Sequence, residues 1–314
     1  MTNQGTVIRS TGSSYSVKTD DGQVVECRLK GRMRLGGSRS TNPVAVGDKV
    51  VFTSDGRDNV ISEVCDRRNY IVRRSTNLSK ESHVIAANVD QALLVTTIDH
   101  PATSTVFIDR FLASAEAYGV ETIITFNKLD LYDADQMAEL EYREAVYQNI
   151  GYKTIRLSST TGEGIDTLKE LLTGKLTAIT GHSGVGKSTL INTLEPGLDI
   201  RTSSISEANN SGRHTTTFAE MHHLSFGADI IDTPGIRGFG IINIDHAETA
   251  HYFRDIFRVS SNCRFPNCTH THEPGCAVAE AVQNGEIAPT RYESYLNIMA
   301  EDEGKYREGG QPKR

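Results

Sequence analysis

The segment GHSGVGKS, from Gly181 to Ser188, constrains the fold of this chain more than any other segment. It follows the apolar run KLTAIT and fits G-x-x-x-x-G-K-[ST], a pattern that forms a phosphate-binding loop between a buried strand and a helix. Its glycines let backbone N–H groups surround phosphate oxygens, and a helix starting near Lys187 would direct its positive end at them. We expect Lys187 to contact the outer phosphates and Ser188 to ligate Mg²⁺. The residues expected around the phosphates are Gly181, His182, Ser183, Gly184, Val185, Gly186, Lys187, Ser188 and Thr189.

A second element, FNKLD, stands earlier in the chain, after the β-rich run ETIITF. The Asp130 carboxylate can accept hydrogen bonds from N1–H and the exocyclic amine of guanine, whereas adenine presents the wrong pattern. We expect Asn127 to tie this loop to the phosphate loop and the stem of Lys128 to cover the base. Ser158 and Ser159, in LSSTTGEG after the strand KTIRL, resemble the turn that backs the base in GTPases. Together these residues predict a guanine site; an ATPase with a chance NKLD is the alternative.

Two further elements follow the phosphate loop. In IIDTPG, Asp232 would hold Mg²⁺ through water and Gly235 would offer its N–H to the γ-phosphate. The segment SGRHTTT lies where the first switch loop belongs, and one of its threonines should reach the metal; we favour Thr216 over Thr215. The elements run NKLD, SST, phosphate loop, TTT, DTPG, and moving the first two to the end restores the usual GTPase order. The sequence therefore predicts one site on a circularly permuted GTPase domain, which is tolerable because domain termini often lie close together.

The pattern along the chain predicts three parts. Short β runs between residues 6 and 72, with a hairpin signal at Asp20–Gly22, predict a small barrel of the OB type. From Gln91, buried strands alternate with helices, as in a mostly parallel α/β sheet. Helices around a cysteine cluster follow, with a disordered tail. We expect a β-barrel over 1–75, a permuted P-loop GTPase domain over 76–244, and a mostly helical zinc-binding segment over 245–314.

The charge is distributed unevenly. Residues 1–80 hold 14 Lys and Arg against 8 Asp and Glu, a net charge of +6, whereas the remainder holds 19 against 32, a net charge of −13. A basic N-terminal part joined to an acidic remainder indicates that the N-terminal part binds a polyanionic partner. Its basic stretch has the period of a strand, which would place positive side chains on one face for RNA phosphates. A protected edge strand is the alternative. The residues are Arg28, Lys30, Arg32, Arg34 and Arg39.

Three of the five cysteines lie between Cys263 and Cys276, with Cys268 between them. The N-terminal sequence lacks a signal core, and no run approaches the roughly 18 apolar residues of a membrane span, so we expect a cytoplasmic chain without a membrane partner. In that compartment the clustering favours a metal over disulfides, which are the alternative. Three thiolates and the imidazole of His270 or His272 could close a tetrahedron around one structural Zn²⁺.

These elements resemble those of the RsgA-type proteins, circularly permuted GTPases stimulated by the small ribosomal subunit. The resemblance covers nearly the whole chain: the barrel, GHSGVGKS, GRHTTT and the zinc-binding segment. It implies a bacterial factor that binds GTP and GDP with Mg²⁺ and acts late in 30S maturation on 16S rRNA, with GTP hydrolysis promoting its release. It favours His270 over His272 as the zinc ligand. We expect a monomer.

The residue that orients the attacking water is not the usual one in this sequence. Where many small GTPases carry a glutamine that orients the attacking water, this chain has Ile236, so intrinsic hydrolysis should be slow. His214, on the expected switch loop, could position water once a partner orders that loop; a surface histidine beside Arg213 is the alternative. The resemblance favours His214, and with Lys187 and Thr216 it forms the expected catalytic set. A non-catalytic RNA-binding protein that only senses guanine nucleotides is the alternative function.

Overall fold

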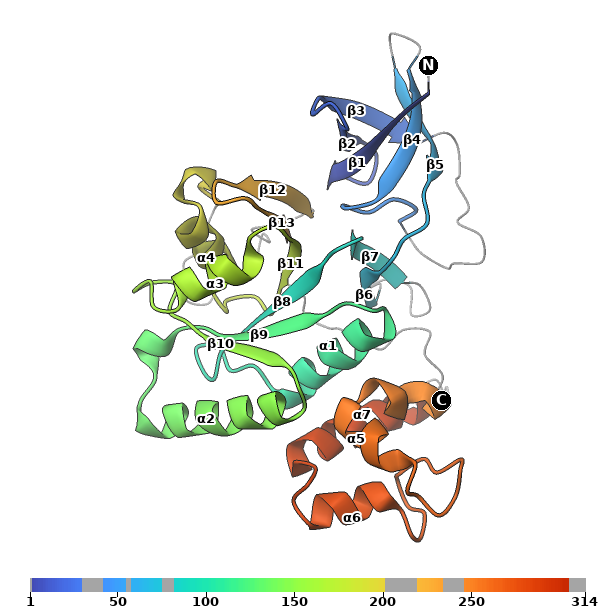
Figure 1. The fold of residues 1–314 in the computed structure, drawn as a ribbon, viewed down its shortest axis with the longest axis vertical. Coiled ribbons are helices and arrows are strands. Elements are labelled where there is room, and N and C mark those ends of the chain that lie inside the picture. Colours follow the sequence, from blue (N-terminus) through green and yellow to red (C-terminus); the bar gives the residue numbers. More distant parts are fainter. Residues whose placement is uncertain are drawn as a thin grey trace, which may run out of the picture.

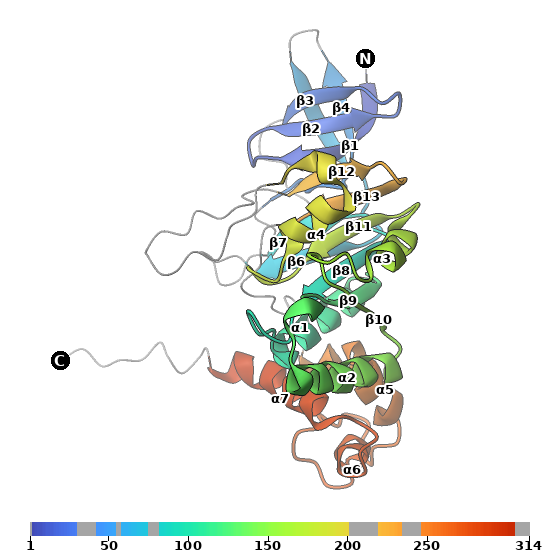
Figure 2. The ribbon, with the colours of Figure 1, turned by 90° about the vertical axis from the view of Figure 1, so that its left-hand side faces the viewer.

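The computed structural model describes residues 2–29, 42–54, 58–74, 82–200, 219–233 and 246–304. The chain forms three parts arranged along the long axis of the molecule (Figures 1 and 2). A β-barrel lies at one end, an α/β domain in the middle and a helical segment at the opposite end. Within the described residues, no helix has the length and apolar character needed to cross a membrane.

The N-terminal part is a closed five-stranded barrel, which confirms the predicted architecture. Its strands follow the order β1-β2-β3-β5-β4, and β4 pairs back with β1. Strands β3 and β5 are parallel, and the turn between β2 and β3 uses Gly22 at a φ of 86°. Alternating apolar side chains, among them Val7, Val17 and Phe52, fill the interior. The strands are β1 (Thr2–Ser10), β2 (Tyr15–Thr19), β3 (Val24–Leu29), β4 (Lys49–Ser54) and β5 (Asn59–Val64).

The central part is an α/β domain, again as predicted. Its strand order is β10-β9-β8-β11-β13-β12, parallel except for β12. Helices α1 and α2 pack on one face of the sheet, and α3 and α4 on the other. The strands are β8 (Gln91–Thr96), β9 (Thr122–Phe126), β10 (Lys153–Arg156), β11 (Leu176–Thr180), β12 (Glu220–Leu224) and β13 (Ala228–Asp232). The helices are α1 (Thr105–Ala117), η1 (Leu129–Leu131), α2 (Ala134–Asn149), α3 (Ile165–Leu172), α4 (Lys187–Leu194) and η2 (Pro196–Leu198).

Local sequence signals explain where the two helices of the first face begin. Ser104 caps α1 by accepting from the N–H of Phe107. Asp133 and Gln136 form a reciprocal capping box at the start of α2. The six residues of β8 are all buried, which is why this strand reads as a continuous apolar run.

A hairpin of β6 (Tyr70–Arg74) and β7 (Ser82–Ala87) was not among the predicted elements. It lies across the predicted boundary at residue 75, and Ile71 and Ile85 join the core under α1. The hairpin also contacts the barrel, because the N–H of Ala87 donates to the carbonyl oxygen of Val46 at 2.9 Å. A Cβ on Gly47 would lie 2.0 Å from the Ala87 carbonyl oxygen, so only glycine fits there. The domain boundaries given above remain predictions.

The C-terminal part consists of helices around the cysteine cluster. Its core includes Phe253, Ile256, Val278 and Tyr295. Helix α7 also packs along α1 of the central domain. The elements are η3 (His246–Tyr252), α5 (Arg254–Ser260), α6 (Ala277–Gln283) and α7 (Pro289–Gly304).

Candidate functional site

The phosphate loop joins the end of β11 to the start of α4, at the centre of the parallel sheet. Gly181 and Gly186 adopt φ angles of 145° and 96°. A Cβ on Gly181 would lie 2.3 Å from the Val95 carbonyl oxygen, and one on Gly186 would lie 2.4 Å from Asn127 Nδ2. Both positions therefore need glycine for space as well as for backbone conformation. The first N–H groups of α4 point back toward the loop, where an anion can accept from them.

Lys187 lies under this loop and is almost completely buried. Its Nζ donates to the carbonyl oxygens of Gly181 at 2.8 Å and His182 at 2.7 Å. Burial lowers the pKa of Lys187 to about 8, against the opposing effect of the Asp232 carboxylate. A buried ammonium group with so little compensating charge is poised to interact strongly with phosphate oxygens.

The loop after β9 contacts both the phosphate loop and the loop after β10 through one buried side chain. Asn127 Nδ2 donates to the Val185 carbonyl oxygen at 2.9 Å. Its Oδ1 accepts from the N–H and the Oγ of Ser159, both at 3.0 Å. Thr193 on α4 donates to the Ser159 carbonyl oxygen at 2.8 Å and braces the same junction. Segments that the sequence places far apart thus meet at Asn127.

Lys128 and Asp130 lie at the edge of this junction. Lys128 takes a left-handed φ of 71°, and its Nζ donates to the Gly184 carbonyl oxygen at 2.8 Å and also to that of His100. Burial lowers the pKa of Lys128, while Asp130 acts against that shift. The exposed Asp130 carboxylate accepts from Ser158 Oγ at 2.5 Å. Ser158 therefore orients a carboxylate that faces solvent beside the phosphate loop.

The remaining described residues of the expected site lie on α4 and β13. Ser188 is half-buried and Thr189 is exposed in the first turn of α4. Asp232 is buried at the end of β13, paired in register with Ile179 of β11. The next residue, Thr233, donates from its Oγ1 to the Ile179 carbonyl oxygen at 2.8 Å. The strand pairing and the bond from Thr233 fix the end of β13, where the Asp232 carboxylate interacts electrostatically with Lys187.

Phe107 and Tyr132 are neighbours of the site that the sequence did not predict. The imidazole of His182 stacks on Phe107 of α1, with ring centroids 3.6 Å apart. Tyr132 donates from its OH to the Asn127 carbonyl oxygen at 2.5 Å and accepts from the N–H of Ile98 at 2.8 Å. Aromatic residues in helices or after a turn usually read as core, so neither had a signal that pointed to the site.

Several predicted site residues lie outside the described residues: the switch-loop residues His214, Thr215 and Thr216, the Gly235 of DTPG, and the basic residues Lys30, Arg32, Arg34 and Arg39. Arg28 is described. It is exposed on β3, where its neighbour Cys27 points into the barrel.

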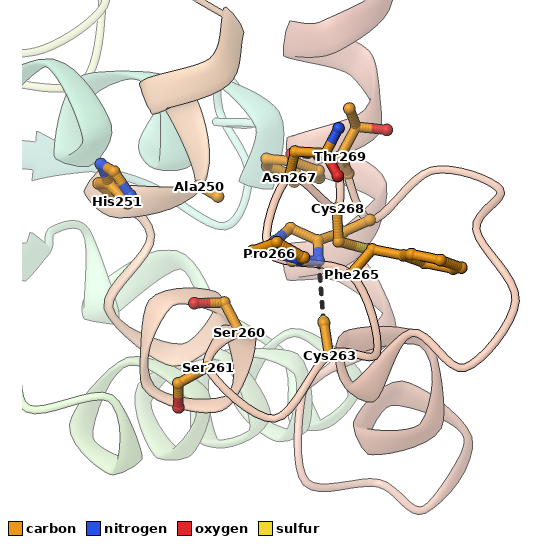
Figure 3. Close-up of a pocket in the computed structure, with 12 residues that line it drawn as sticks. Ala250, His251, Ser260, Ser261, Cys263, Phe265, Pro266, Asn267, Cys268 and Thr269 are labelled. Atoms are coloured by element: carbon orange, nitrogen blue, oxygen red, sulfur yellow. Dashed lines mark hydrogen bonds between the residues drawn. The ribbon is translucent and has the colours of Figure 1, made fainter.

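The second candidate site is the cysteine cluster, of which Figure 3 labels Cys263 and Cys268. One ligand atom from each of Cys263, Cys268, His270 and Cys276 lies within 4.8 Å of the others. His270 Nδ1 lies 3.5 Å from the Cys263 sulfur and 3.6 Å from the Cys276 sulfur. Tetrahedral bonds of about 2.3 Å to sulfur and about 2.0 Å to nitrogen require an N–S separation of about 3.5 Å. The four side chains therefore fit a tetrahedral metal ion, and the cysteines form no disulfide.

The structure brings His270 and not His272 into this cluster. His270 is buried, whereas His272 is exposed, with its Nδ1 2.8 Å from Thr271 Oγ1. Burial and the neighbouring thiols raise the pKa of Cys268 to about 12. A bound dication would reverse that effect by stabilising the thiolates, so metal binding would release protons.

Comparisons with known proteins identify the family to which the barrel and the α/β domain belong. The family model described as the RsgA GTPase matches residues 64–242, and the RsgA N-terminal domain model matches residues 4–61. A Bacteroides fragilis protein named small ribosomal subunit biogenesis GTPase RsgA is 55% identical over 307 residues, covering 97% of this chain and 99% of its own length. The crystal structure of YjeQ from Thermotoga maritima is 37% identical with a TM-score of 0.76, covering 97% of this chain and 99% of that chain.

The structure of YloQ, described as a circularly permuted GTPase, is 29% identical with a TM-score of 0.72, covering 100% of this chain and 98% of that chain. Together the two family models span the barrel and the permuted domain, and the relative and the two structures cover nearly the whole chain. The resemblance seen in the motifs is thereby confirmed, and the chain belongs to the RsgA GTPase family.

Proposed function

We propose that this GTPase acts in the maturation of the small ribosomal subunit, binding its 16S rRNA and leaving when GTP is hydrolysed. The GTPase activity follows from the family, and the relative named for small-subunit biogenesis supports the partner. One observation carries the nucleotide site: Asn127 bonds Val185 of the phosphate loop and Ser159 of the loop after β10. This joint makes a single site out of elements that stand in permuted order.

In this proposal each part of the site has a separate task. Asp130, oriented by Ser158, accepts from guanine, and Lys128 covers the base. Lys187 and the N–H groups of the phosphate loop stabilise charge on the phosphate oxygens while water attacks the γ-phosphorus and its bond to the leaving GDP oxygen breaks. Ser188 and Thr216 would hold Mg²⁺, with Asp232 acting through water; when bound, the ion neutralises charge on the β- and γ-phosphates.

The water that attacks needs a partner to orient it. Ile236 cannot hydrogen-bond water, so we propose that basal turnover is slow and that His214 completes the site when the subunit binds. His214→Ala should leave GDP affinity nearly intact and lower subunit-stimulated turnover by about 10²-fold. Unchanged stimulated turnover would exclude this role for His214.

We propose that the barrel holds rRNA through its basic stretch. Arg28 is exposed on β3, which supports an outward-facing set. Replacing Arg28, Lys30, Arg32 and Arg34 by Gln should weaken binding to 30S particles and flatten its salt dependence by up to about 0.7–0.9 per lost contact. Basal GTP turnover serves as the internal control and should not change. If 30S binding and its salt slope survive, another surface holds the RNA.

We also propose that the metal of the cysteine cluster is one structural Zn²⁺. Three thiolates and one imidazole leave no open position, which suits a structural role.

Acting on the small ribosomal subunit, the protein would work as a monomer in the bacterial cytoplasm, where subunits are assembled. Sizing by light scattering tests the monomer.

The experiment that tests the proposal is GTP turnover measured with purified 30S, 50S and 70S particles. We expect turnover to rise by about 10²-fold or more with 30S, as partner-completed GTPase sites do, and to stay near basal with 50S. Equal turnover with and without 30S would contradict stimulation by the subunit. No GTP turnover with any particle, together with GDP-sensitive RNA binding, would instead identify a nucleotide sensor that does not catalyse hydrolysis.

A further inference from the structure

A buried arginine connects the C-terminal segment to the α/β domain. Arg291, near the start of α7, donates from Nη1 to Asp109 of α1 at 2.6 Å. Its Nη2 and Nε donate to the two oxygens of Asp255 on α5, at 2.9 Å and 3.1 Å. Tyr147 of α2 donates to the same Asp109 oxygen at 2.9 Å. All of these side chains are buried, so α1, α2, α5 and α7 meet at one charged, water-excluded point.

From this point, α7 reaches the metal cluster within one turn. Tyr292 donates from its OH to the carbonyl oxygen of the ligand His270 at 2.7 Å. Tyr295 donates to the Thr269 carbonyl oxygen at 2.8 Å. The Phe253 ring contacts both Arg291 and Tyr295. The Arg291 guanidinium carbon lies 4.7 Å from its centroid, and the Tyr295 ring packs edge-on against it with centroids 5.5 Å apart. The backbone of the metal loop is thus held by the helix that carries Arg291.

In the other direction, α1 reaches the phosphate loop. Asp109 lies half a turn from Phe107, whose ring stacks on His182 with centroids 3.6 Å apart. The carbonyl oxygen of His182 accepts from Lys187 Nζ at 2.7 Å. Phe107 is buried in the core beneath the sheet, so a shift of α1 along its axis would move the His182 side of the loop.

We propose that α7 and α1 couple the metal cluster to the phosphate loop, which makes Arg291 and Phe107 positioning residues for the nucleotide. The cysteine cluster has two states, one ordered with its metal ion and one without the ion, because so short a metal-binding segment needs the ion to keep its structure. Without the ion, Tyr292 and Tyr295 lose their fixed carbonyl partners, and α7 no longer holds Asp109 in one place. The proposal rests on the guanine-nucleotide site proposed above.

The coupling is measured as the ratio of GDP dissociation constants in metal-free and Zn²⁺-loaded protein, with a fluorescent GDP analogue. The ion is removed with a chelator and then restored, and recovery of the original affinity excludes irreversible unfolding. We expect the metal-free protein to bind GDP about 5-fold or more weakly, the lower range of typical site-to-site coupling. By reciprocity, saturating GDP should strengthen Zn²⁺ binding by the same factor, measured by competition with a chromogenic chelator.

The route is tested with Phe107→Leu, which keeps an apolar side chain but removes the ring stacked on His182. This variant should bind GDP with one affinity whether or not Zn²⁺ is present. Phe111→Leu is the matched control, one turn further along α1 in the same core, and should keep the wild-type ratio. Tyr292→Phe, which removes only the OH bonded to His270, should also lower the ratio.

Each outcome has one meaning. A wild-type ratio near one overturns the coupling, and a wild-type ratio retained by Phe107→Leu overturns the route through α1. Failure of the Zn²⁺-loaded wild type to bind GDP at all would contradict the proposed function instead, before any ratio is measured.

Discussion

Replacing Arg291 by methionine should loosen the join between the C-terminal segment and the α/β domain. Methionine can occupy the space of the aliphatic stem, but it leaves the carboxylates of Asp109 and Asp255 without the cation that bonds both. Those side chains are 0% and 3% exposed. Removing one partner of a buried ion pair costs about 3–5 kcal/mol, because the remaining charge stays out of water.

The matched control is Arg258→Met, which removes the same charge from the same segment. Arg258 on α5 lies 3.9 Å from Glu286, and both side chains are more than half exposed, at 57% and 55%. A surface pair of this kind contributes at most about 1 kcal/mol. The structure therefore predicts a large difference between two substitutions that look equivalent in the sequence.

Amide hydrogen exchange is the suitable assay, because a chain of several domains does not unfold in one step. Peptides from α1, α5 and α7 should exchange about 10²-fold faster or more in Arg291→Met, since about 1.4 kcal/mol corresponds to a factor of ten. Arg258→Met should leave these rates close to wild type. Adding Asp109→Asn and Asp255→Asn to Arg291→Met should restore part of the protection, because no buried charge remains. Equal exchange in the two single variants would refute the reasoning.

Three further predictions concern the nucleotide and metal sites. Asn127→Ala leaves buried polar groups of Val185 and Ser159 without their hydrogen-bond partner, and each unsatisfied group costs about 1–3 kcal/mol. The affinity for GDP, measured by calorimetry, should therefore fall by about 10²-fold. Wild-type affinity would contradict the role of Asn127 in joining the loops. Native mass spectrometry should find one Zn²⁺ per chain in the wild type and in His272→Ala but none in His270→Ala, and the reverse pattern would exchange the two histidines. The lowered pKa of Lys187, about 8, means that free protein at higher pH holds a neutral lysine that bound phosphates would recharge. GDP binding should therefore take up about 0.8 proton at pH 8.5 and about 0.1 at pH 7, measured by calorimetry in buffers of different ionisation enthalpy. Proton uptake that does not change with pH would contradict this role of Lys187.

The parts of the fold with strong local signals could be predicted from the sequence. Strands β8, β9 and β11 are buried on both faces and read as apolar runs, and the glycines of the phosphate loop follow one of them. The hairpin β6–β7 could not be predicted in this way, because its place is set by contacts with the barrel loop at Val46.

The long-range contacts of the sites were also beyond the sequence. Arg291 and Asp109 are 182 residues apart, and charged residues on helices usually belong to a solvated face. The spacing of the cysteines left His270 and His272 open as ligands, and the structure distinguishes them by burying His270 beside the cysteine sulfurs while His272 is exposed.

The central claim is that NKLD and the phosphate loop form one guanine site, and Asp130→Asn tests it most directly. The carboxylate is thought to accept two hydrogen bonds from guanine, each worth about 1.5–3 kcal/mol when one partner is charged. An amide would instead present a donor, which suits the second oxo group of xanthine. We predict that the variant binds GTP about 10²-fold more weakly and xanthosine triphosphate more tightly than the wild type, measured side by side by calorimetry. Wild-type affinity for GTP in Asp130→Asn would show that NKLD does not read the base, and the single permuted site would be wrong.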